Sequence, residues 1–433
     1  MTSATTQILP PASNSGLQQP RDDLPSLWRD VAGRDNWAGM LDPIDPLLRA
    51  ELMRYGEFAQ ACYDAFDFDP YSRYCGGCKY TPRCFFESLG KGNAGYEVTR
   101  YLYATLDKRS WSESANWIGY VAVSDDATTA RLGRRDIAVC WRGTVTDLEK
   151  IADLTEVQQP VHAEGIPTPD RSVKVMAGFV NLYTDKNTAD RYSKYSVREQ
   201  VLAEVRRQVL RYAEERGEEV SISITGHSLG SALATLSAYD LAEVGLNRLA
   251  PAGGKERVLP VTVYSFAGPR LGNESFKDRF EKALGLKCLR VLNVHDVVPT
   301  VPGVVINEDT PGLLRSAGAL IPWSYWHVGV KLALDYRRSP FLQDTKFDFF
   351  GFHNLETHLH LLDGHHGTGR SFAMVSGRDP ALVNKSLDFL KEEHMVPPKW
   401  RQDANRGLTR TANGRWTQPA RTRDDDHPAD IDD

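Results

Sequence analysis

Residues 220–236, with the sequence VSISITGHSLGSALATL, constrain the fold and function of this chain more than any other stretch. Apolar and polar residues alternate from Val220 to Thr225, which is the pattern of a half-buried β-strand. The pentapeptide Gly226-His227-Ser228-Leu229-Gly230 follows, and small and apolar residues at helical density come after it. A strand, Gly-x-Ser-x-Gly and a helix together are typical of a nucleophile elbow. The alternative is an ordinary Gly/Ser turn, but because both flanks fit we predict that Ser228 is a catalytic nucleophile.

The residues around the serine fit the physical needs of such an elbow. A serine at a sharp strand-to-helix turn sits in strained backbone, and Gly226 and Gly230 leave room for the strand and helix to approach. The N-terminus of the helix places backbone N–H groups where an oxyanion would form, and the N–H of Leu229 is among them. We therefore expect Leu229 to be one donor of an oxyanion hole.

Composition excludes several classes of function. The chain has 433 residues, of which 41% are hydrophobic and 25% charged, and this is ordinary for a soluble globular protein. Its net charge of −5 and the absence of a Lys/Arg-rich run argue against nucleic acid as a partner. No apolar run approaches the roughly 18–20 residues of a transmembrane segment, so any contact with a membrane must be peripheral.

Three of the six cysteines, Cys75, Cys78 and Cys84, form the sequence CGGCKYTPRC. Such spacing occurs in zinc sites, but the segment supplies only three ligands, and no histidine occurs before His162. A local disulfide or free thiols are therefore favoured over zinc, and we expect neither a metal nor another cofactor. Cys140 lies in an apolar run and is predicted to be a buried thiol.

Strand and helix patterns alternate through residues 117–295 and predict an α/β fold, with a mostly parallel central sheet flanked by helices. Ser196 and Glu199 form a capping box, so a helix is expected to begin at Ser196. Asn413-Gly414 predicts a hairpin turn. Helical patterns also occur at 25–66, 353–362 and 380–394. Strands are expected at 96–103, 117–123, 135–141, 220–225, 258–266 and 286–294.

The two ends of the chain differ in composition from the rest. Residues 1–21 are rich in Ser, Thr, Pro and Gln and lack acidic residues, which predicts a disordered arm with the character of a shortened organelle transit peptide. Residues 424–433 are acidic and predict a disordered, solvated tail. Residues 22–423 are predicted to form a single α/β-hydrolase domain, with a helical extension at its N-terminus and a helix and hairpin at its C-terminus.

A catalytic serine requires a base and a carboxylate that orients the base. In α/β hydrolases the acid and then the histidine follow the serine along the chain. Asp296 comes just after the apolar run LRVLNV, so we favour it as the acid over an ordinary turn aspartate. Arg142-Gly143-Thr144 ends an earlier strand, and Thr144 is placed to offer a second oxyanion donor unless these residues form a plain turn.

The base is less clear from the pattern. His353 follows Gly351 at the start of a helix, where a loop can swing an imidazole towards the serine, and we favour it over the alternatives. His327, the next candidate, lies in a strand-like run. Eight histidines follow the predicted acid: His327, His353, His358, His360, His365, His366, His394 and His427.

Two histidines are direct neighbours of the predicted triad. His227 precedes the serine and His295 precedes the aspartate. Because adjacent side chains project away from each other, neither is placed to act as the base. Each is expected to pack against the site or to support it.

Five segments together resemble the class 3 lipases, and more closely the plant class I phospholipase A1 enzymes: CWRGT, GHSLGSAL, FAGPRLGN, NVHDVVP and HNLETHLHLLDGHHG. The segments RDNWAGMLDPIDPLLRAELMRYGEFAQACYDAFDFDPYSRYCGGCKY, GYVAVSDD and GRDPALVNKSLDFLKEEHMVPPKWRQDAN also match the pattern of the plant group. The resemblance covers nearly all of residues 21–423.

This resemblance implies a lipid acyl hydrolase that attacks the sn-1 ester of phospholipids at a membrane surface and, in several members, galactolipids or triacylglycerols. It assigns the nucleophile to Ser228, the acid to Asp296, and the base, which precedes Asn-Leu-Glu in the family, to His353. It also assigns the oxyanion residue after Arg-Gly to Thr144, beside Leu229. The triad would act through an acyl-enzyme.

Further implications concern the surroundings of the site. Residues 145–153 correspond to the lid of class 3 lipases. Ser231 stands where many relatives have a second glycine, and a small residue there should be tolerated. Many class I members are plastid enzymes, which implies a chloroplast location, or a cytoplasmic one if the short N-terminal arm is not a transit peptide.

Two other functions stay open from the sequence. One is a soluble carboxylesterase or thioesterase with the same triad, which would not gain activity above the aggregation point of its substrate. The other is a catalytically idle lipid-binding protein on a lipase fold, against which the complete set of Ser228, Asp296 and His353 argues. Head-group preference, chain-length preference and oligomeric state have no signal in the sequence.

Overall fold

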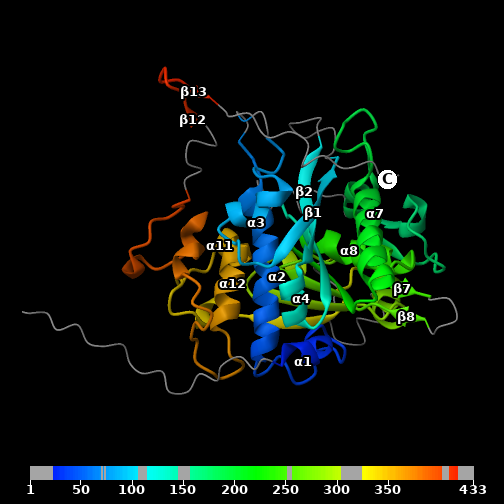
Figure 1. Ribbon diagram of the computed structural model, residues 1–433. Helices are drawn as coiled ribbons and strands as arrows, with labels where there is room; N and C mark the ends of the chain where they lie inside the picture. Colours follow the sequence, from blue (N-terminus) through cyan, green and yellow to red (C-terminus); the bar gives the residue numbers. More distant parts are fainter. Residues whose placement is uncertain are drawn as a thin grey trace, which may run out of the picture.

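The computed structural model describes residues 23–69, 72, 75–105, 115–144, 157–250, 256–303, 324–401 and 409–417. At its centre lies a seven-stranded sheet with the order β1-β2-β3-β6-β9-β10-β11 (Figure 1). β2 runs antiparallel to both of its neighbours, β1 and β3, and all strands from β3 onward are parallel. The mostly parallel sheet predicted from the sequence is therefore confirmed. The strands are β1 (Tyr96–Ala104), β2 (Asn116–Ser124), β3 (Arg135–Trp141), β6 (Val220–His227), β9 (Val261–Phe266), β10 (Lys287–Asn293) and β11 (Val330–Leu334).

Helices cover both faces of this sheet (Figure 1). Helices α2 (Pro46–Ala65) and α12 (Leu355–Gly364) pack on one face, and α6 (Ala177–Thr184), α7 (Val197–Val209) and α8 (Leu229–Glu243) pack on the other. Both faces need cover because successive side chains of β3 point to opposite faces, and those from Ile137 to Trp141 are all apolar. Ala138 and Cys140 face the first group of helices, while Ile137 and Val139 face the second. Cys140 is fully buried, as predicted. A parallel sheet buried on both faces is the expected arrangement of an α/β protein.

Shorter elements surround this core. The short helices are α1 (Leu24–Val31), α3 (Phe85–Ser88), α4 (Asp126–Leu132), α9 (Glu274–Asp278) and α11 (Phe349–His353). The two-stranded sheets pair β4 (Gln158–Pro160) with β5 (Lys174–Met176), β7 (Arg248–Leu249) with β8 (Arg257–Val258), and β12 (Thr409–Arg410) with β13 (Trp416–Thr417). No helix in these parts of the chain is long and apolar enough to span a bilayer.

A buried carboxylate ties α2 to the sheet. Asp136 on β3 accepts hydrogen bonds from Tyr55 of α2 (3.0 Å) and Tyr96 of β1 (2.9 Å). It also accepts from the hydroxyls of Ser221 and Ser223 on β6, at 2.7 and 2.6 Å. Four hydroxyl donors satisfy a carboxylate that has no exposure to water. The network fixes the helix that precedes the site against the strand that leads into the elbow.

Several local predictions are confirmed. The backbone N–H of Glu199 donates to Ser196 Oγ, and the Glu199 carboxylate accepts from the Ser196 N–H, so the capping box exists. Gly414 has φ 81° in the turn between β12 and β13, as the hairpin at Asn413-Gly414 requires. The strand expected at 258–266 is divided into β8 and β9 around Leu259 and Pro260.

The helix expected at 380–394 is wrong. The segment forms two short 3-10 turns, Pro380–Lys385 and Glu392–His394, with extended chain between them. The side-chain oxygen of Asn384 accepts from the backbone N–H groups of Phe389 and Leu390, both at 2.8 Å, and so replaces the helical acceptors. The predicted arm over 1–21 and tail over 424–433 lie outside the described residues.

Candidate active site

Ser228 occupies the tight turn between β6 and α8. Its backbone has φ 60° and ψ −127°, a conformation that a residue with a side chain adopts only under constraint. A Cβ on Gly226 would be 2.2 Å from the carbonyl oxygen of Gly230, and a Cβ on Gly230 would be 2.5 Å from that of Trp141. The two glycines are therefore required for the strand, the helix and β3 to meet at this point.

The predicted acid and the predicted base form a direct pair. Asp296 follows the C-terminal end of β10, and His353 is the last residue of α11. Their Oδ2 and Nδ1 atoms are 2.7 Å apart, and both side chains are buried. A carboxylate only accepts hydrogen bonds, so Nδ1 carries the hydrogen and Nε2 of the neutral ring keeps its lone pair. His327 lies elsewhere, with its Nε2 bonded to the carbonyl oxygen of Pro299 at 2.7 Å.

The two atoms that would react, the serine oxygen and the outer nitrogen of the histidine, are buried and free to bond with each other or with a substrate. Ser228 Oγ and His353 Nε2 are each buried and lack a hydrogen-bond partner in the described structure. The ring of His227, next to the serine, lies 4.7 Å from the ring of His353 between centroids, which places the histidine beside the elbow. Catalytic hydrogen bonds are often long before substrate binds. This arrangement supports the assignment of Ser228, Asp296 and His353 as a triad.

One predicted oxyanion donor, Leu229, directly follows the serine, and Gly143, the residue before the other donor, lies against the serine. Leu229 is the first residue of α8 and directly follows Ser228. On the other side, a Cβ on Gly143 would be 3.1 Å from Ser228 Cβ and 2.5 Å from the His227 carbonyl oxygen. The end of β3 thus contacts the elbow through a glycine, and Thr144 is the next residue. Residues 145–153, expected to be a lid, lie outside the described residues.

The sequence did not reveal a hydrogen-bonded pair behind the base. The hydroxyl of Tyr63, in the last turn of α2, lies 2.7 Å from His227 Nδ1, and His227 Nε2 lies 2.7 Å from the His353 carbonyl oxygen. Burial, followed by the neighbouring His353 and His358, lowers the pKa of His227 well below its usual value. The neutral ring donates from Nε2 to the carbonyl and accepts from Tyr63 at Nδ1. His227 therefore supports the C-terminal end of α11, which carries the proposed base, as expected for a neighbour of the predicted nucleophile.

Another supporting group positions the acid. Asp296 Oδ1 accepts from the backbone N–H of Val298 at 3.0 Å, which leaves Oδ2 for the base. His358, one turn into α12, accepts from the Asn293 N–H at 3.2 Å and lies 4.0 Å from Asp296 Oδ2. Burial lowers the pKa of His358.

Ser231 has a fitting environment in place of the glycine of many relatives. Its hydroxyl donates to the carbonyl oxygens of Gly226 (2.6 Å) and Phe266 (3.0 Å). A Cβ on Gly268 would be 2.5 Å from Ser231 Cβ, so the opposing residue must stay small. The serine side chain is thus accommodated beneath the elbow without an unsatisfied hydroxyl.

Of the three alternatives for the cysteine segment, a zinc site, a disulfide or free thiols, the structure has free thiols. Cys75, Cys78 and Cys84 are free thiols, as are the other three cysteines of the chain. Cys78 Sγ is buried and lies 3.3 Å from the Tyr101 hydroxyl, whereas Cys75 is exposed. Within the described ranges no three His, Cys, Asp or Glu side chains group as metal ligands.

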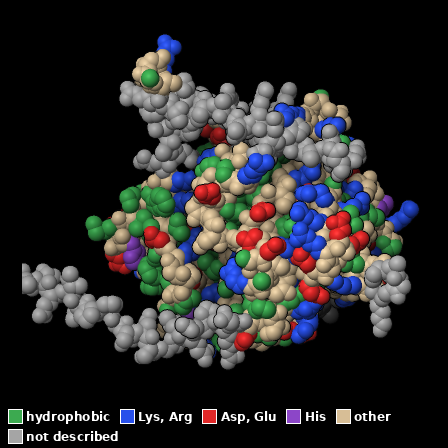
Figure 2. Space-filling view, viewed as in Figure 1, with side chains coloured by type: hydrophobic (Ala, Val, Ile, Leu, Met, Phe, Trp, Pro, Cys, Tyr) green, Lys and Arg blue, Asp and Glu red, His purple; other side chains and the backbone are tan. Residues whose placement is uncertain are grey.

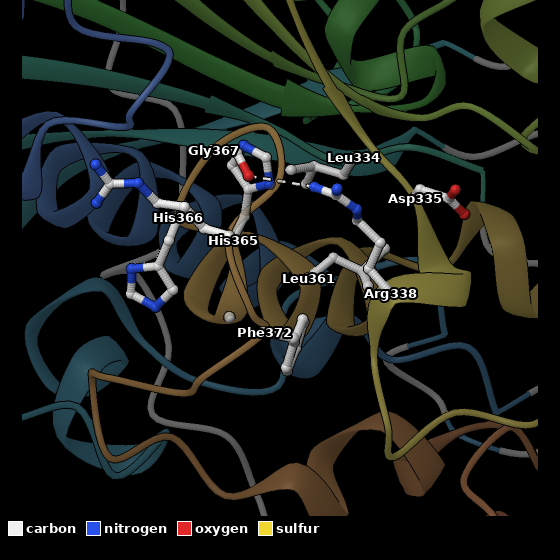
Figure 3. A pocket seen from close by; sticks show the side chains of 10 residues that line it. Leu334, Asp335, Arg338, Leu361, His365, His366, Gly367 and Phe372 are labelled. Carbon is white, nitrogen blue, oxygen red and sulfur yellow. Dashed lines mark hydrogen bonds between the residues drawn. The ribbon is translucent and has the colours of Figure 1, made fainter.

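Two surface pockets lie apart from the proposed triad. The pocket of about 270 Å³ in Figure 3 lies between the end of β11 and the end of α12, and there Arg338 donates to the Gly367 carbonyl oxygen at 3.2 Å. A second pocket of about 260 Å³ is lined by His327, Arg290 and neighbouring residues. None of the three proposed catalytic side chains lines either pocket.

Comparison with known proteins gives a consistent result. Residues 138–306 match the family described as Lipase (class 3). Phospholipase A1-Igamma1, chloroplastic, from Arabidopsis thaliana is 58% identical over 93% of this chain and 80% of its own length. Phospholipase A1-Igamma2, chloroplastic, from the same plant is 54% identical over 92% of this chain and 77% of its own length. Both names support a plastid location for this chain.

A solved structure, the lipase from Rhizopus microsporus var. chinensis, is 20% identical and covers 76% of this chain and 91% of its own, with a TM-score of 0.44. Identity at this level concerns the fold alone. The architecture described above, with a largely parallel sheet and the serine at the turn after β6, is that of an α/β hydrolase.

Proposed function

Because this chain belongs to the class 3 lipase family, among its plant phospholipase A1 members, we propose that it releases the sn-1 acyl chain of phospholipids. The chain is a carboxylic ester hydrolase of the serine type. The observation that carries the proposed mechanism is the 2.7 Å contact between His353 Nδ1 and Asp296 Oδ2, beside the constrained turn at Ser228. Galactolipids and triacylglycerols are further candidate substrates.

The reaction proceeds in two steps. Ser228 Oγ attacks the ester carbonyl while His353 Nε2 takes its proton, and Asp296 stabilises the imidazolium that forms. The backbone N–H groups of Leu229 and Thr144 hold the oxyanion of the tetrahedral intermediate. The intermediate collapses to an acyl-serine as His353 protonates the leaving glycerol oxygen. Water, deprotonated by the same histidine, then attacks the acyl-serine, and the fatty acid is released as His353 returns the proton to Ser228 Oγ.

The test uses lipids whose two acyl chains differ. Phosphatidylcholine and a galactolipid, each with different sn-1 and sn-2 chains, are incubated with the protein, and the released fatty acids are identified by mass spectrometry. We expect release of the sn-1 chain. Equal release of both chains would instead support a general lipase, and hydrolysis restricted to monomeric esters would support the soluble esterase.

The serine mechanism is tested separately. Ser228→Ala should lower kcat by at least about 10³-fold, since the acyl-enzyme cannot form. Ser237→Ala is the matched control, because Ser237 is a buried serine of α8 whose hydroxyl donates to the Ala234 carbonyl oxygen within the same helix. Full hydrolysis by the Ser228→Ala variant would overturn the mechanism.

An exposed apolar ridge beside the base supports peripheral contact with a lipid surface. Phe347, Phe349 and Phe350 are 80%, 49% and 65% exposed, and they lead directly into His353. Figure 2 shows hydrophobic side chains gathered at the left of the molecule, on the side where Figure 1 draws α11 and the chain that follows α12. Transfer of a phenylalanine side chain from water to an apolar phase is favourable by about 1.5–3 kcal/mol. The ridge therefore stabilises an orientation in which the base lies near the lipid.

Replacing all three phenylalanines of the ridge by serine should weaken sedimentation with phosphatidylcholine vesicles at least tenfold. It should leave kcat/KM for a monomeric short-chain ester within about twofold, because the triad is untouched. Val258→Ser, at an apolar residue on β8 that is about as exposed as Phe349, is the control. Unchanged vesicle binding by the triple variant would show that another face contacts the lipid.

A further inference from the structure

Arg142 is a buried cation that directly follows β3, and the groups that hold it are neutral. The residue is 6% exposed. Its Nε donates to the Trp117 carbonyl oxygen at 3.1 Å, and its Nη1 donates to the Gly143 carbonyl oxygen at 2.9 Å. The guanidinium carbon lies 3.8 Å from the centroid of the Phe66 ring. Two backbone carbonyls and an aromatic face thus hold the charge in one place.

No carboxylate of the described residues pairs with this guanidinium, in contrast to the buried Arg134, whose Nη2 lies 2.9 Å from Glu51. The half-buried Arg198 also pairs with a carboxylate, at 2.7 Å from Asp240. Burial lowers the pKa of Arg142 to about 10, against the opposing effect of Tyr63 and Cys62, so it stays cationic at neutral pH. A buried charge without a counter-charge is costly to keep, and its presence calls for a function.

The carbonyl that Nη1 contacts belongs to the peptide unit joining Gly143 to Thr144. The N–H of that same unit is the N–H of Thr144, the proposed oxyanion donor. In a planar trans peptide the C=O and N–H bonds point in opposite directions, so binding the carbonyl on one side turns the N–H to the other. The unit adjoins the nucleophile, since a Cβ on Gly143 would be 3.1 Å from Ser228 Cβ.

We infer that Arg142 is a positioning residue for the oxyanion hole, an inference that rests on the proposed serine mechanism. Its guanidinium orients the Gly143–Thr144 peptide and polarises it, which makes the Thr144 N–H a stronger donor. The oxyanion of the tetrahedral intermediate supplies the counter-charge that the resting site lacks. Stabilisation of this kind acts on the transition state and leaves substrate binding almost unchanged.

The test compares Arg142→Met, Arg142→Gln and Arg142→Lys in the full chain, on a monomeric short-chain ester. Removing one direct oxyanion donor typically lowers kcat by about 10²–10³-fold, so loss of the group behind a donor should lower it about 10–100-fold for the Met variant. KM should stay within about twofold. The affinity of a trifluoromethyl ketone, which forms a tetrahedral adduct with serine, should fall by the same factor as kcat. The Lys variant should recover part of the lost kcat, because lysine keeps the positive charge but lacks the forked N–H groups of the guanidinium.

The Gln variant keeps an N–H donor without the charge and should fall between Lys and Met. Arg198→Met, which removes a partly buried arginine that pairs with Asp240 near the end of α8 opposite the serine, is the control and should lower only the unfolding temperature. Variants that lose thermal stability but keep kcat and ketone affinity would assign Arg142 a purely structural role and overturn the inference. If the Met variant does not fold, the Gln and Lys variants decide by the same criterion. The ester and the ketone report on the serine mechanism alone, so a negative result with phospholipids leaves this test valid.

Discussion

At the scale of single residues, the hydroxyl of Tyr63 is the contact whose loss is most informative. It lies 2.7 Å from His227 Nδ1, and the other ring nitrogen of His227, Nε2, is hydrogen-bonded to the carbonyl oxygen of His353. Tyr63→Phe leaves a buried ring nitrogen without a donor, which should cost about 1–3 kcal/mol of the free energy of unfolding. We also expect kcat to fall about 5–20-fold, because the end of α11 that carries the proposed base loses one constraint. Steady-state kinetics and urea unfolding measure the two effects.

Tyr239→Phe is the matched control, since that hydroxyl bonds Thr168 at 3.0 Å on the far side of α8. It should lower stability and leave kcat unchanged. Equal kinetics for wild type and Tyr63→Phe would show that the contact contributes only to folding.

Gly143 is the second residue at which a small change should have a large effect. An added methyl would lie 2.2 Å from the Tyr63 hydroxyl and 2.5 Å from the His227 carbonyl oxygen, and the latter is backbone that cannot move aside. Gly143→Ala should therefore push β3 away from the elbow and lower kcat by at least about 100-fold. Gly92→Ala is the control, because the nearest atom to its Cβ is 3.9 Å away. Retention of activity by Gly143→Ala would mean that the proposed oxyanion segment is not needed there.

At the scale of elements, the carboxylate of Asp136 joins α2, β1, β3 and β6. It receives four hydroxyl hydrogen bonds, the two shortest of them from Ser221 and Ser223. Asp136→Asn retains the size of the side chain but loses the charge and half of the acceptor capacity. It should lower the free energy of unfolding by about 2–4 kcal/mol. Urea unfolding measures this, with Tyr96→Phe, which removes one donor, expected to cost about 1 kcal/mol. A wild-type midpoint for Asp136→Asn would contradict the role of the network.

The elements of the sheet could be predicted because their patterns are local. Alternation at 220–225 followed by small residues specifies β6 and α8, and the glycines at the turn specify a close approach. The helix expected at 380–394 failed for a non-local reason, since Asn384 takes over the N–H groups of Phe389 and Leu390. Apolar residues that pack into the core there gave a helical pattern without a helix.

The site divides in the same way between local and distant information. The proposed nucleophile, Ser228, and the proposed acid, Asp296, each follow a strand, so local sequence patterns could propose both of them. The sequence left eight histidines as candidates for the base. His353 reaches Asp296 from the five-residue helix α11, which is too short to show a helical period in the sequence. Tyr63 precedes its partner by 164 residues, so no local pattern indicates the contact.

At the scale of the whole molecule, buried neutral histidines make the fold sensitive to acid. Burial is the first cause of a lowered pKa at four of them, and for one, His360, the pKa falls to about 3. The others are His227, His327 and His358. An unfolded histidine has a pKa of about 6.5. Below about pH 6.5 these histidines bind protons in the unfolded chain but stay neutral in the folded chain. The free energy of unfolding that they contribute above that pH is therefore lost as the pH falls.

The size of this loss can be estimated and measured. Each histidine that stays neutral removes up to about 1.4 kcal/mol per pH unit below pH 6.5, so four of them should lower the free energy of unfolding by about 3–5 kcal/mol between pH 7 and pH 5.5. Carboxylates contribute little there, because their usual pKa values lie near about 4. Urea unfolding at a series of pH values measures the slope. His360→Gln should reduce the loss by about 1 kcal/mol, since one proton is no longer gained on unfolding, whereas His162→Gln, at an exposed position, should not change it. A flat stability profile across this range would show that these rings are protonated in the fold, and that the tautomer deduced for His227 is wrong.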